Sequence, residues 1–308
     1  MESSSEMLLS VLIPVYRHHP AALLEQLAVE ISTFAQAEVE VLVYDDSAAS
    51  DAFHWHAAAL STYSWLKIYT HSVNLGRSEA RNVLLSKANG AFVWFLDGDV
   101  TLSAGTLPIY LTALQQEAAV HCSGIAVPES APNNFRNSYS RKAEVKTAAE
   151  RNRAPYRSFS AANFAMPKHF AQTVKFPVTH RGYGHEDTHF GLQLLNQRLP
   201  LRHLDAPVWH AATDSDAVFV EKSKEATENL ARLFVHDPLF ERYWREIRLL
   251  RIWELSRNLG FVFFITPFLS LIESRLKKGQ APIWLLNVYK LGCFERAYLS
   301  ELAAKRRS

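Results

Sequence analysis

Cysteine is scarce in this sequence, with only Cys122 and Cys293 among 308 residues. Two such residues cannot build a disulfide framework, and neither belongs to a Cys-x-x-Cys pair of a metal or redox site. Residues 1–6 place no basic region ahead of an apolar stretch, so we expect no signal peptide. These absences favour a reducing, cytoplasmic location.

Long apolar segments are also lacking. The apolar stretch 261–272 is about 12 residues long and is interrupted by Pro267, whereas a helix needs about 20 residues to span a bilayer. With 48% hydrophobic and 21% charged residues, the chain can still bury a substantial core. Its length suits one large domain, or one domain with an appendage.

A large net charge is absent overall, at +2, but the two parts of the chain differ. Residues 241–308 hold 13 Lys and Arg against 6 Asp and Glu, a net charge of +7. The preceding 240 residues hold 20 against 25, a net charge of −5. A mildly acidic body argues against nucleic acid as a partner. The basic tail favours contact with an anionic surface.

Strands alternate with helices along the first 210 residues. Helices are expected at 20–36, 51–60, 77–88, 104–117, 167–174 and 186–198. Short apolar runs predict strands at 8–15, 39–44, 66–70, 91–96, 157–165 and 201–204. Residues 128–157 read instead as a long polar connection, typical of a lid or a disordered loop. The alternation predicts an α/β fold with a mostly parallel, Rossmann-like sheet flanked by helices.

Acidic residues follow two of the predicted buried strands. Asp45 and Asp46 end the strand 39–44, and Asp97-Gly98-Asp99 follows the strand 91–96. Right-handed crossovers bring the C-terminal ends of parallel strands to one edge, where ligands bind, so the four carboxylates should cluster. Mg²⁺ and Mn²⁺ are often bound by one or two carboxylates together with substrate phosphates. For Asp97-Gly98-Asp99 alone, a simple turn is the alternative.

Five segments, in order and at similar spacing, resemble the motifs of the family 2 glycosyltransferases, which have the GT-A fold. They are SVLIPVY (10–16), VYDDS (43–47), NLGRSEARN (74–82), DGD (97–99) and GYGHED (182–187). The glycine-rich lead into the last one is most similar to the chondroitin- and capsule-polymerase branch, which makes surface polysaccharides. The resemblance covers about residues 8–215. It implies a GT-A catalytic domain at 1–215 and a helical C-terminal appendage at 216–308.

The resemblance also implies a nucleotide-sugar donor, with a UDP-sugar favoured. Asp46, beside Asp45, would accept the uracil N3–H, and Arg81 would approach the nucleotide or diphosphate. Asp97 and Asp99 match the family's metal motif, with Asp99 as the main ligand of Mn²⁺ or Mg²⁺ and Asp97 closer to the ribose or a metal-bound water. The other donor-side positions in the matching segments are Pro14, Tyr16, Asn74, Gly76 and Arg77, and His210 lies where many relatives place a third metal ligand.

Glu186 and Asp187 match the acceptor side of the family's site. Asp187 would be the general base that deprotonates a hydroxyl of a glycan or lipid-linked acceptor, and Glu186 would hydrogen-bond that acceptor. One base with no opposing nucleophile implies a single inverting displacement. The dipole of a helix beginning at Glu186 would favour the charged carboxylate. The alternative is that both residues are ordinary acidic residues of a first helical turn.

Two other function classes remain open. His185-Glu186-Asp187-Thr188-His189 matches the H-E-x-x-H helix of zinc metallohydrolases. The glycine and third histidine of the longer zinc motif are absent, because Leu192 and Leu195 occupy those positions. The second alternative is a degenerate GT-A module that binds nucleotide or glycan without turnover. Retention of Asp97, Asp99 and Asp187 argues against it.

The C-terminal region combines basic, aromatic and short apolar segments between residues 241 and 290. In 241–260, aromatic and aliphatic residues recur about every third position among arginines. This pattern is typical of a segment that lies at a membrane surface. It predicts a peripheral location on the inner face of the cell membrane. The alternative is a helical subdomain packed on the catalytic body or on a second subunit.

Overall fold

The computed structural model describes residues 8–33, 38–47, 55–178 and 183–307, which fall into two compact units. The first, called the sheet unit, comprises Met1–Pro128, Val145–Val178 and Leu194–His210. The second, called the helical unit, comprises Glu129–Glu144, Thr179–Gln193 and Ala211–Ser308. The division at residue 215 stays a prediction. By packing, residues 129–144 and 183–193 group with the C-terminal helices.

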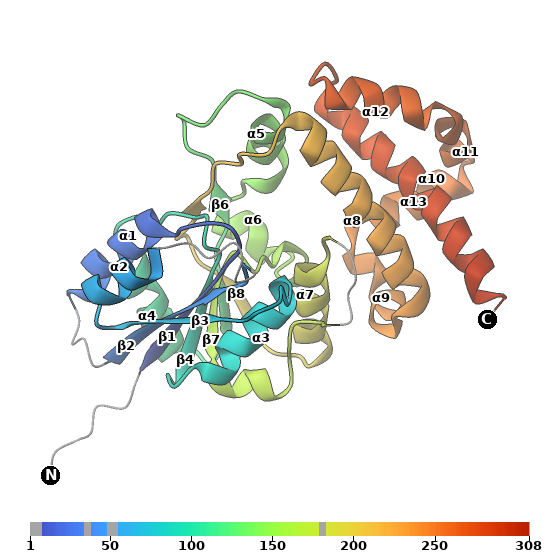
Figure 1. Ribbon diagram of the computed structural model, residues 1–308. Coiled ribbons are helices and arrows are strands. Elements are labelled where there is room, and N and C mark those ends of the chain that lie inside the picture. The colour runs from blue at the N-terminus through green and yellow to red at the C-terminus, as the bar shows by residue number, and fades with distance from the viewer. Residues whose placement is uncertain (1–7, 34–37, 48–54, 179–182, 308) are drawn as a thin grey trace, which may run out of the picture. The chain divides into compact units, whose positions relative to one another are not determined.

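The sheet unit contains a seven-stranded sheet in the order β3-β2-β1-β4-β7-β5-β8 (Figure 1). The pairs β3–β2, β2–β1, β1–β4 and β5–β8 are parallel, and β7 is antiparallel to both of its neighbours. The predicted mostly parallel α/β fold is therefore confirmed. The strands are β1 (Leu9–Val15), β2 (Val39–Asp45), β3 (Leu66–Thr70), β4 (Phe92–Leu96), β5 (Val120–Cys122), β7 (Asn163–Pro167) and β8 (Leu201–His203), with a separate pair β6 (Ile125–Ala126) and β9 (Val208–Trp209).

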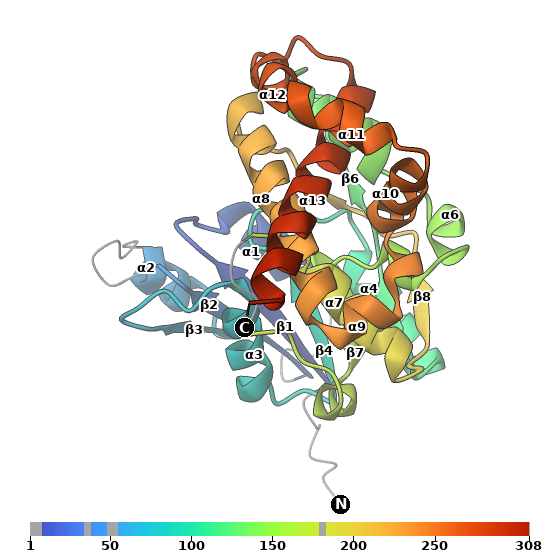
Figure 2. The same ribbon diagram turned by 90° about the vertical axis from the view of Figure 1, so that its right-hand side faces the viewer.

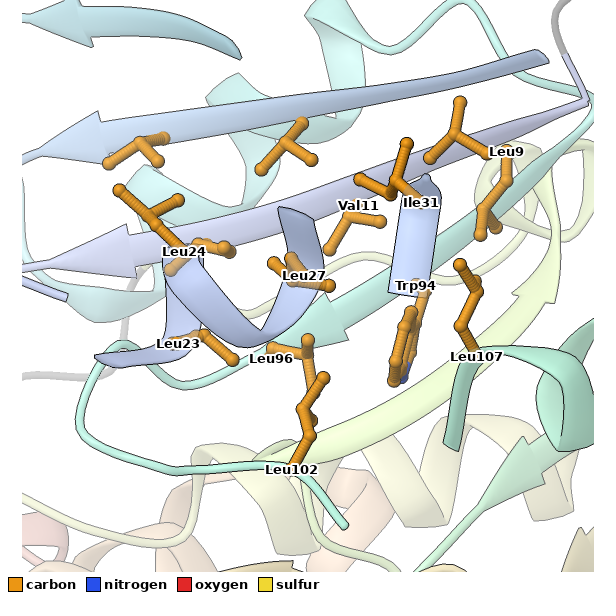
Figure 3. Packing of buried hydrophobic residues seen from close by; sticks show 14 of the residues in the cluster. Leu9, Val11, Leu23, Leu24, Leu27, Ile31, Trp94, Leu96, Leu102 and Leu107 are labelled. Carbon is orange, nitrogen blue, oxygen red and sulfur yellow. The ribbon is translucent and has the colours of Figure 1, made fainter. Parts of the chain in front are cut away.

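Helices cover both faces of the sheet because the direction in which the chain adds strands reverses after β3. The chain moves outward from β1 to β3 and then returns past β1 to β4, so right-handed connections place α1 and α3 on opposite faces. Apolar residues of α1 pack on Val11 and Trp94, whose side chains share one face (Figure 3). The unit's helices are α1 (Ala21–Ile31), α2 (Trp55–Thr62), α3 (Arg77–Lys87), α4 (Thr106–Gln116) and α6 (Ala148–Asn152), with 3₁₀ turns η4 (Tyr156–Ser158) and η5 (Lys168–Gln172).

The polar connection predicted at 128–157 contains several short helices, which corrects the expectation of a disordered loop. Thr147 and Glu150 form a reciprocal capping box at the start of α6. Arg151 is buried and donates to the ring of His203 and to the carbonyls of Ser123 and Ser158. The strand expected at 157–165 begins later, at Asn163, because 156–158 form a 3₁₀ turn.

The helical unit is built around the long helices α8 (Asp216–His236) and α13 (Ile283–Lys305), which pack on each other (Figure 2). Ser215 caps α8 by accepting a hydrogen bond from the Val218 amide over 3.3 Å. Two apolar clusters, one around Phe294 and one around Leu286, form its core. Its other elements are α5 (Phe135–Tyr139), η3 (Ser140–Glu144), α7 (Glu186–Asn196), α9 (Pro238–Arg242), η6 (Trp244–Glu246), α10 (Arg248–Asn258), α11 (Phe261–Ile265), η7 (Thr266–Phe268) and α12 (Leu269–Lys277). The residues of α7 after Gln193 belong to the sheet unit.

No single helix in the described part of the chain is long and apolar enough to span a bilayer. The pair formed by Arg248–Asn258 and Phe261–Lys277 meets the length and composition test only when taken together, and it is bent by 92°.

Candidate functional site

The C-terminal ends of β2 and β4 lie on either side of the end of β1, as predicted from the crossover rule. The amide of Asp46 donates to the carbonyl of Val15 over 2.9 Å. A Cβ atom at Gly98 would lie 2.5 Å from Cγ1 of Val15 and 3.2 Å from the carbonyl oxygen of Pro14. Only glycine therefore lets the backbone between Asp97 and Asp99 approach β1 so closely. The four carboxylates follow strand ends that share this edge.

Asp97 is held by a buried arginine from α3. Arg81 Nη2 donates to Asp97 Oδ1 over 2.6 Å, and the guanidinium lies 5.1 Å from the ring centroid of Phe176. The arginine side chain is almost fully buried, whereas that of Asp97 is partly exposed. Nε and Nη1 of Arg81 are buried and have no hydrogen-bond partner among the described residues. Buried donors without partners are uncommon, and a bound ligand or water normally satisfies them.

Asp99 lies beside His210, with 3.4 Å between Asp99 Oδ2 and His210 Nε2. The backbone explains this proximity. Thr101 and Trp209 form an antiparallel bridge with two hydrogen bonds of 2.9 and 2.8 Å, so the flanking residues Asp99 and His210 are brought together. His210 also donates its amide to the carbonyl of Ala126. The Asp99 side chain remains 56% exposed, so it is accessible to a ligand.

The charge of Asp99 is favoured by its surroundings. Burial raises the pKa of this carboxyl, but a hydrogen bond with His210 and the positive charges of His210 and Arg77 lower it by more. The resulting pKa lies below the usual value. Asp99 is therefore ionised at neutral pH, as a cation ligand must be.

The chemistry of this pair fits Mn²⁺ or Mg²⁺. Carboxylate oxygens suit both cations, and imidazole suits transition metals. Within the described residues, no three His, Cys, Asp or Glu side chains are grouped so that they could hold a metal ion. The predicted set of Asp97, Asp99 and His210 is thus not assembled as a three-residue group, and Oδ1 of Asp97 accepts from Arg81 instead. A cation at Asp99 would take its remaining ligands from water and substrate phosphates.

Asp45 is buried at the end of β2 and has two partners. Its Oδ1 accepts from the Ser47 amide over 3.0 Å, and its Oδ2 lies 2.8 Å from Nε2 of His56. His56 comes from α2 and was not predicted as a site residue. The hydroxyl of Ser47 in turn accepts from the amide of Arg17, which has a positive φ of 50°. Asp45 therefore fixes the backbone that follows β2 through Ser47 and links it to α2 through His56.

Asp46 orders the loop that leads into α3. Its Oδ1 accepts from the Leu75 amide over 2.6 Å, and its Oδ2 accepts from the Gly76 amide and the Asn74 side chain, both over 2.8 Å. Burial raises the pKa of Asp46, the two amide bonds lower it, and the nearby Asp45 raises it again, so that the pKa lies above its usual value. An ionised carboxylate has about four acceptor positions. Three of them are used here, which leaves room for one more donor.

The remaining donor-side candidates lie around the same edge. Pro14 is half-buried in β1, and Tyr16 and Arg77 are exposed. Gly76 has a φ of 83°, a conformation that glycine adopts without strain, and it directly precedes the first turn of α3. All of these residues belong to the sheet unit.

Glu186 and Asp187 form the first turn of α7 in the helical unit, as predicted. The loop before them is attached to α8. Gly184 has a φ of 89°, its carbonyl accepts from Asn229 over 2.8 Å, and a Cβ atom on it would lie 2.8 Å from Cβ of Ala226. The glycine-rich lead therefore has a packing reason. Gly182, the first residue of the matching segment, lies outside the described residues.

The histidines of the zinc alternative serve other contacts. His185 precedes α7 with a φ of 71°, and its Nδ1 lies 3.1 Å from the Thr188 hydroxyl. Nδ1 of His189 lies 2.7 Å from Gln193 Nε2, and its Nε2 lies 3.3 Å from Asp237 Oδ2. Both ring nitrogens of His189 are thus engaged by protein side chains. With no three-residue metal group in the described part of the chain, the geometry does not support a zinc hydrolase.

His56 contacts Asp45 and Phe176 contacts Arg81, and neither residue was predicted from the sequence. The Thr101–Trp209 bridge, which sets His210 beside Asp99, was not predicted either. Only the bridge had a signal in the sequence. Trp209 and His210 directly follow the apolar residue Val208, as in a short strand at the end of the sheet unit. The contacts of His56 and Phe176 join segments distant in sequence and have no local pattern.

Comparisons with known proteins agree with this geometry. A family model described as glycosyl transferase family 2 matches residues 10–172. Among solved structures, residues 1–349 of S. aureus TarS are 18% identical, with a TM-score of 0.52, and the match covers 97% of this chain and 92% of that one. No curated protein matches the chain.

Two further solved structures were obtained with nucleotide sugars. S. aureus TarS 1–349 in complex with UDP-GlcNAc is 16% identical, with a TM-score of 0.51 and coverage of 97% of this chain and 92% of that one. The mannosyltransferase PcManGT from Pyrobaculum calidifontis, in complex with GDP-Man and Mn²⁺, is 14% identical, with a TM-score of 0.60 and coverage of 98% and 89%. At these identities the likeness concerns the fold alone.

Proposed function

This chain belongs to glycosyl transferase family 2, and from that premise we propose that it transfers a sugar from a nucleotide-sugar donor, by inversion, to a hydroxyl of a glycan or lipid-linked acceptor. The observation that carries the donor side of the proposal is the pair Asp99–His210 at the carboxyl edge of a parallel sheet. That edge is where open α/β sheets bind nucleotides. The Mn²⁺-containing complex of the similarly folded mannosyltransferase supports a divalent cation.

On the donor side, the residues of the sheet unit divide into three roles. Asp46 has one acceptor position left for the N3–H of a uracil ring, and it holds the loop 74–76 beside it. Arg81 orients Asp97 and has two further donors for an anionic group. Asp99 and His210 would hold Mn²⁺ or Mg²⁺, which offsets the charge that develops on the diphosphate leaving group. These roles favour UDP over other nucleotides.

On the acceptor side, Asp187 accepts the proton of the attacking hydroxyl. The acceptor oxygen then forms a bond to the anomeric carbon as the bond between that carbon and the diphosphate oxygen breaks. The nucleoside diphosphate leaves with the bonding electrons, and the proton remains on Asp187. Glu186 hydrogen-bonds the acceptor. The positive end of the α7 dipole favours the ionised form of both carboxylates before the reaction.

A panel of nucleotide sugars tests this proposal. UDP-, GDP- and dTDP-sugars are incubated with the full chain and Mn²⁺ or Mg²⁺, and the released nucleotide is measured together with donor binding. We expect binding and slow hydrolysis of a UDP-sugar that require the cation. Binding of no nucleotide sugar would contradict the proposal. Binding of one, with no turnover in the presence of any glycan acceptor, would favour the degenerate module instead.

A further inference from the structure

The bent helix pair of the helical unit exposes several large apolar side chains. Its first arm is α10 and its second arm runs from Phe261 to Lys277, with a 92° bend between them. We call residues 248–278 the wedge. Figure 2 shows α10, α11 and α12 beside α13, in agreement with their packing contacts. Large exposed apolar patches on a folded protein mark interaction sites.

Most of the exposed apolar residues of the wedge form one stripe on each arm. On α10 they are Ile252, Leu255 and Leu259, at spacings of three and four residues. This spacing places them on a single helix face. On the second arm the stripe recurs at spacings of three, four and three, and it comprises Phe261, Phe264, Phe268 and Leu271. Phe263 is exposed as well, but its position in the sequence places it outside this stripe. The exposure is greatest near the bend, where Leu259 and Phe264 are each 73% exposed.

The opposite face of each arm is already occupied. Leu250, Trp253 and Val262 are buried in the cluster around Phe294, and Ile265 and Leu269 are buried in the cluster around Leu286. The wedge is therefore anchored to the helical unit by its inner face. Its outer stripe is not needed for that packing. The apolar character of the outer stripe thus requires a separate explanation.

The bend itself depends on Gly260. This residue has a φ of 73°, and a Cβ atom on it would meet nothing within 4 Å. The left-handed conformation ends α10 and turns the chain directly into α11. The result is an apolar corner formed by Leu259 and Phe261, with one arm leaving on each side.

Basic residues extend both stripes at the ends away from the bend. Arg248 and Arg251 lie at the start of α10, and Arg275 and Lys278 lie at the far end of the second arm, four and seven residues after Leu271. All four are exposed, and none forms an ion pair within the described part of the chain. Of the two acidic residues in the wedge, Glu273 pairs with Lys277 over 2.9 Å, which leaves Glu254 as the exposed carboxylate. The outer face is thus apolar at the corner and positive at both ends.

We propose that the wedge is an interfacial membrane anchor that inserts its apolar corner into a bilayer containing anionic lipids. Amphipathic helices at interfaces bury their apolar face about 5–10 Å deep, at the boundary of headgroups and acyl chains. An 11-residue arm is about 16 Å long at 1.5 Å per residue, so its far end stays at the headgroup level. There the four cations meet lipid phosphates, and each one near an anionic surface strengthens binding about fivefold.

The charge distribution argues against a second copy of this chain as the occupant. A two-fold contact brings the same patch of both subunits together. Across this face it would oppose eight exposed cations with only two exposed Glu254 carboxylates, and like charges at an interface disfavour association. A bilayer supplies both an apolar layer and a layer of negative charge at the matching depth.

Vesicle flotation tests the proposal with the full chain and without nucleotide sugar. The vesicles are phosphatidylcholine alone or phosphatidylcholine with about one third phosphatidylglycerol. We expect the protein to float with the anionic vesicles and at least tenfold less with the neutral ones. Leu259→Ser/Phe264→Ser should reduce the bound fraction at least tenfold, and Arg248→Gln/Arg275→Gln about twenty-fivefold, taking fivefold per cation.

Two control variants remove similar groups elsewhere. Val29→Ser/Leu60→Ser removes exposed apolar side chains of α1 and α2, and Arg153→Gln/Arg306→Gln removes two exposed cations. Both should float like the wild type. Absence of flotation with anionic vesicles, or equal loss in the wedge and control variants, overturns the proposal. So does a dimer in solution that Leu259→Ser/Phe264→Ser dissociates while flotation is unchanged. Because no donor is present, failure here leaves the proposed glycosyl transfer untouched.

Discussion

Arg81 donates to Asp97 over 2.6 Å, while Asp99, two residues further along, has its carboxylate 3.4 Å from His210. The two acidic residues of one short motif therefore have different partners. Arg81 holds Asp97 from the α3 side, and Asp99 remains accessible beside an imidazole. This difference is the basis of the proposal that Asp99 binds the cation and Asp97 belongs to the fixed wall of the donor site.

Arg81→Gln should weaken both folding and donor binding. The substitution removes the partner of Asp97 and the guanidinium packed on Phe176, and loss of a hydrogen bond to a charged group costs about 1.5–3 kcal/mol. We expect the free energy of unfolding to fall by about that amount and the Kd for the donor to rise at least tenfold. Urea unfolding and calorimetric titration measure the two effects. Arg153→Gln, on the surface of the same unit, is the control, and equal effects of both variants would contradict the role of Arg81.

Gly98→Ala should damage the donor edge without touching a ligand group. Its Cβ would lie 2.5 Å from Val15 Cγ1, so the turn between Asp97 and Asp99 has to move. Overpacking of this kind costs about 1–3 kcal/mol. Gly105→Ala is the matched control, because a Cβ there meets nothing within 4 Å and only its positive φ is unfavourable. We expect donor binding to be lost in Gly98→Ala and retained in Gly105→Ala. Retention in both would show that the close approach to β1 is unimportant.

Asp187→Asn should separate binding from chemistry. An amide cannot accept the proton of the acceptor hydroxyl, and general base catalysis contributes about 10²–10⁴-fold. Transfer should fall by that factor while the Kd for the donor changes less than twofold. The measurements are product formation and calorimetric titration of the nucleotide sugar. Normal transfer by this variant would remove Asp187 from the mechanism and reduce Glu186-Asp187 to helix-start charges.

His203 should make the stability of the sheet unit depend on pH. Burial lowers its pKa most, the hydrogen bond to the Pro155 carbonyl raises it, and the positive charge of Arg151 lowers it again, so that the pKa is about 4. The unfolded chain takes up this proton below about pH 6.5, whereas the folded chain does so only near 4. Stability from the neutral ring is therefore complete above pH 6.5 and is lost as the pH falls toward 4.

The check is urea unfolding of the wild type and His203→Gln at pH 7.5 and pH 5.0. Between pH 6.5 and 5.0 the wild type should lose about 2 kcal/mol more than the variant, at about 1.4 kcal/mol per pH unit. Equal losses in the two proteins would show that His203 is not kept neutral by its surroundings.

The strands at the centre of the sheet could be predicted because they are short apolar runs with polar ends. The edge strand 66–70 was also predicted, at its observed bounds. The position of the acidic residues 45–46 and 97–99 at one edge of the sheet follows from the crossover rule. Antiparallel β7 could not be predicted as such. Its direction depends on how the chain returns through α6 and the 3₁₀ turn at 156–158, and no local pattern records that path.

The residues of the candidate site could be predicted where they belong to a family motif. The contacts that depend on packing could not be predicted. Asp99 and His210 came from the family resemblance, but their proximity depends on the backbone bridge between Thr101 and Trp209. The sequence also could not show that Arg81 donates a hydrogen bond to Asp97, because both residues had been predicted to bind the nucleotide-sugar donor. The partners of buried side chains depend on three-dimensional packing that residue types alone do not specify.

The central claim is that Asp99 helps to bind a nucleotide sugar through a divalent cation. Calorimetric titration of a UDP-sugar into the wild type and Asp99→Asn, each with Mn²⁺ and with EDTA, tests it most directly. We predict that Mn²⁺ tightens binding to the wild type at least tenfold and has no effect on the variant. The control is Glu117→Gln, at a partly exposed acidic residue of the same unit, which should behave as wild type. Equal Mn²⁺ dependence in wild type and Asp99→Asn would contradict the account.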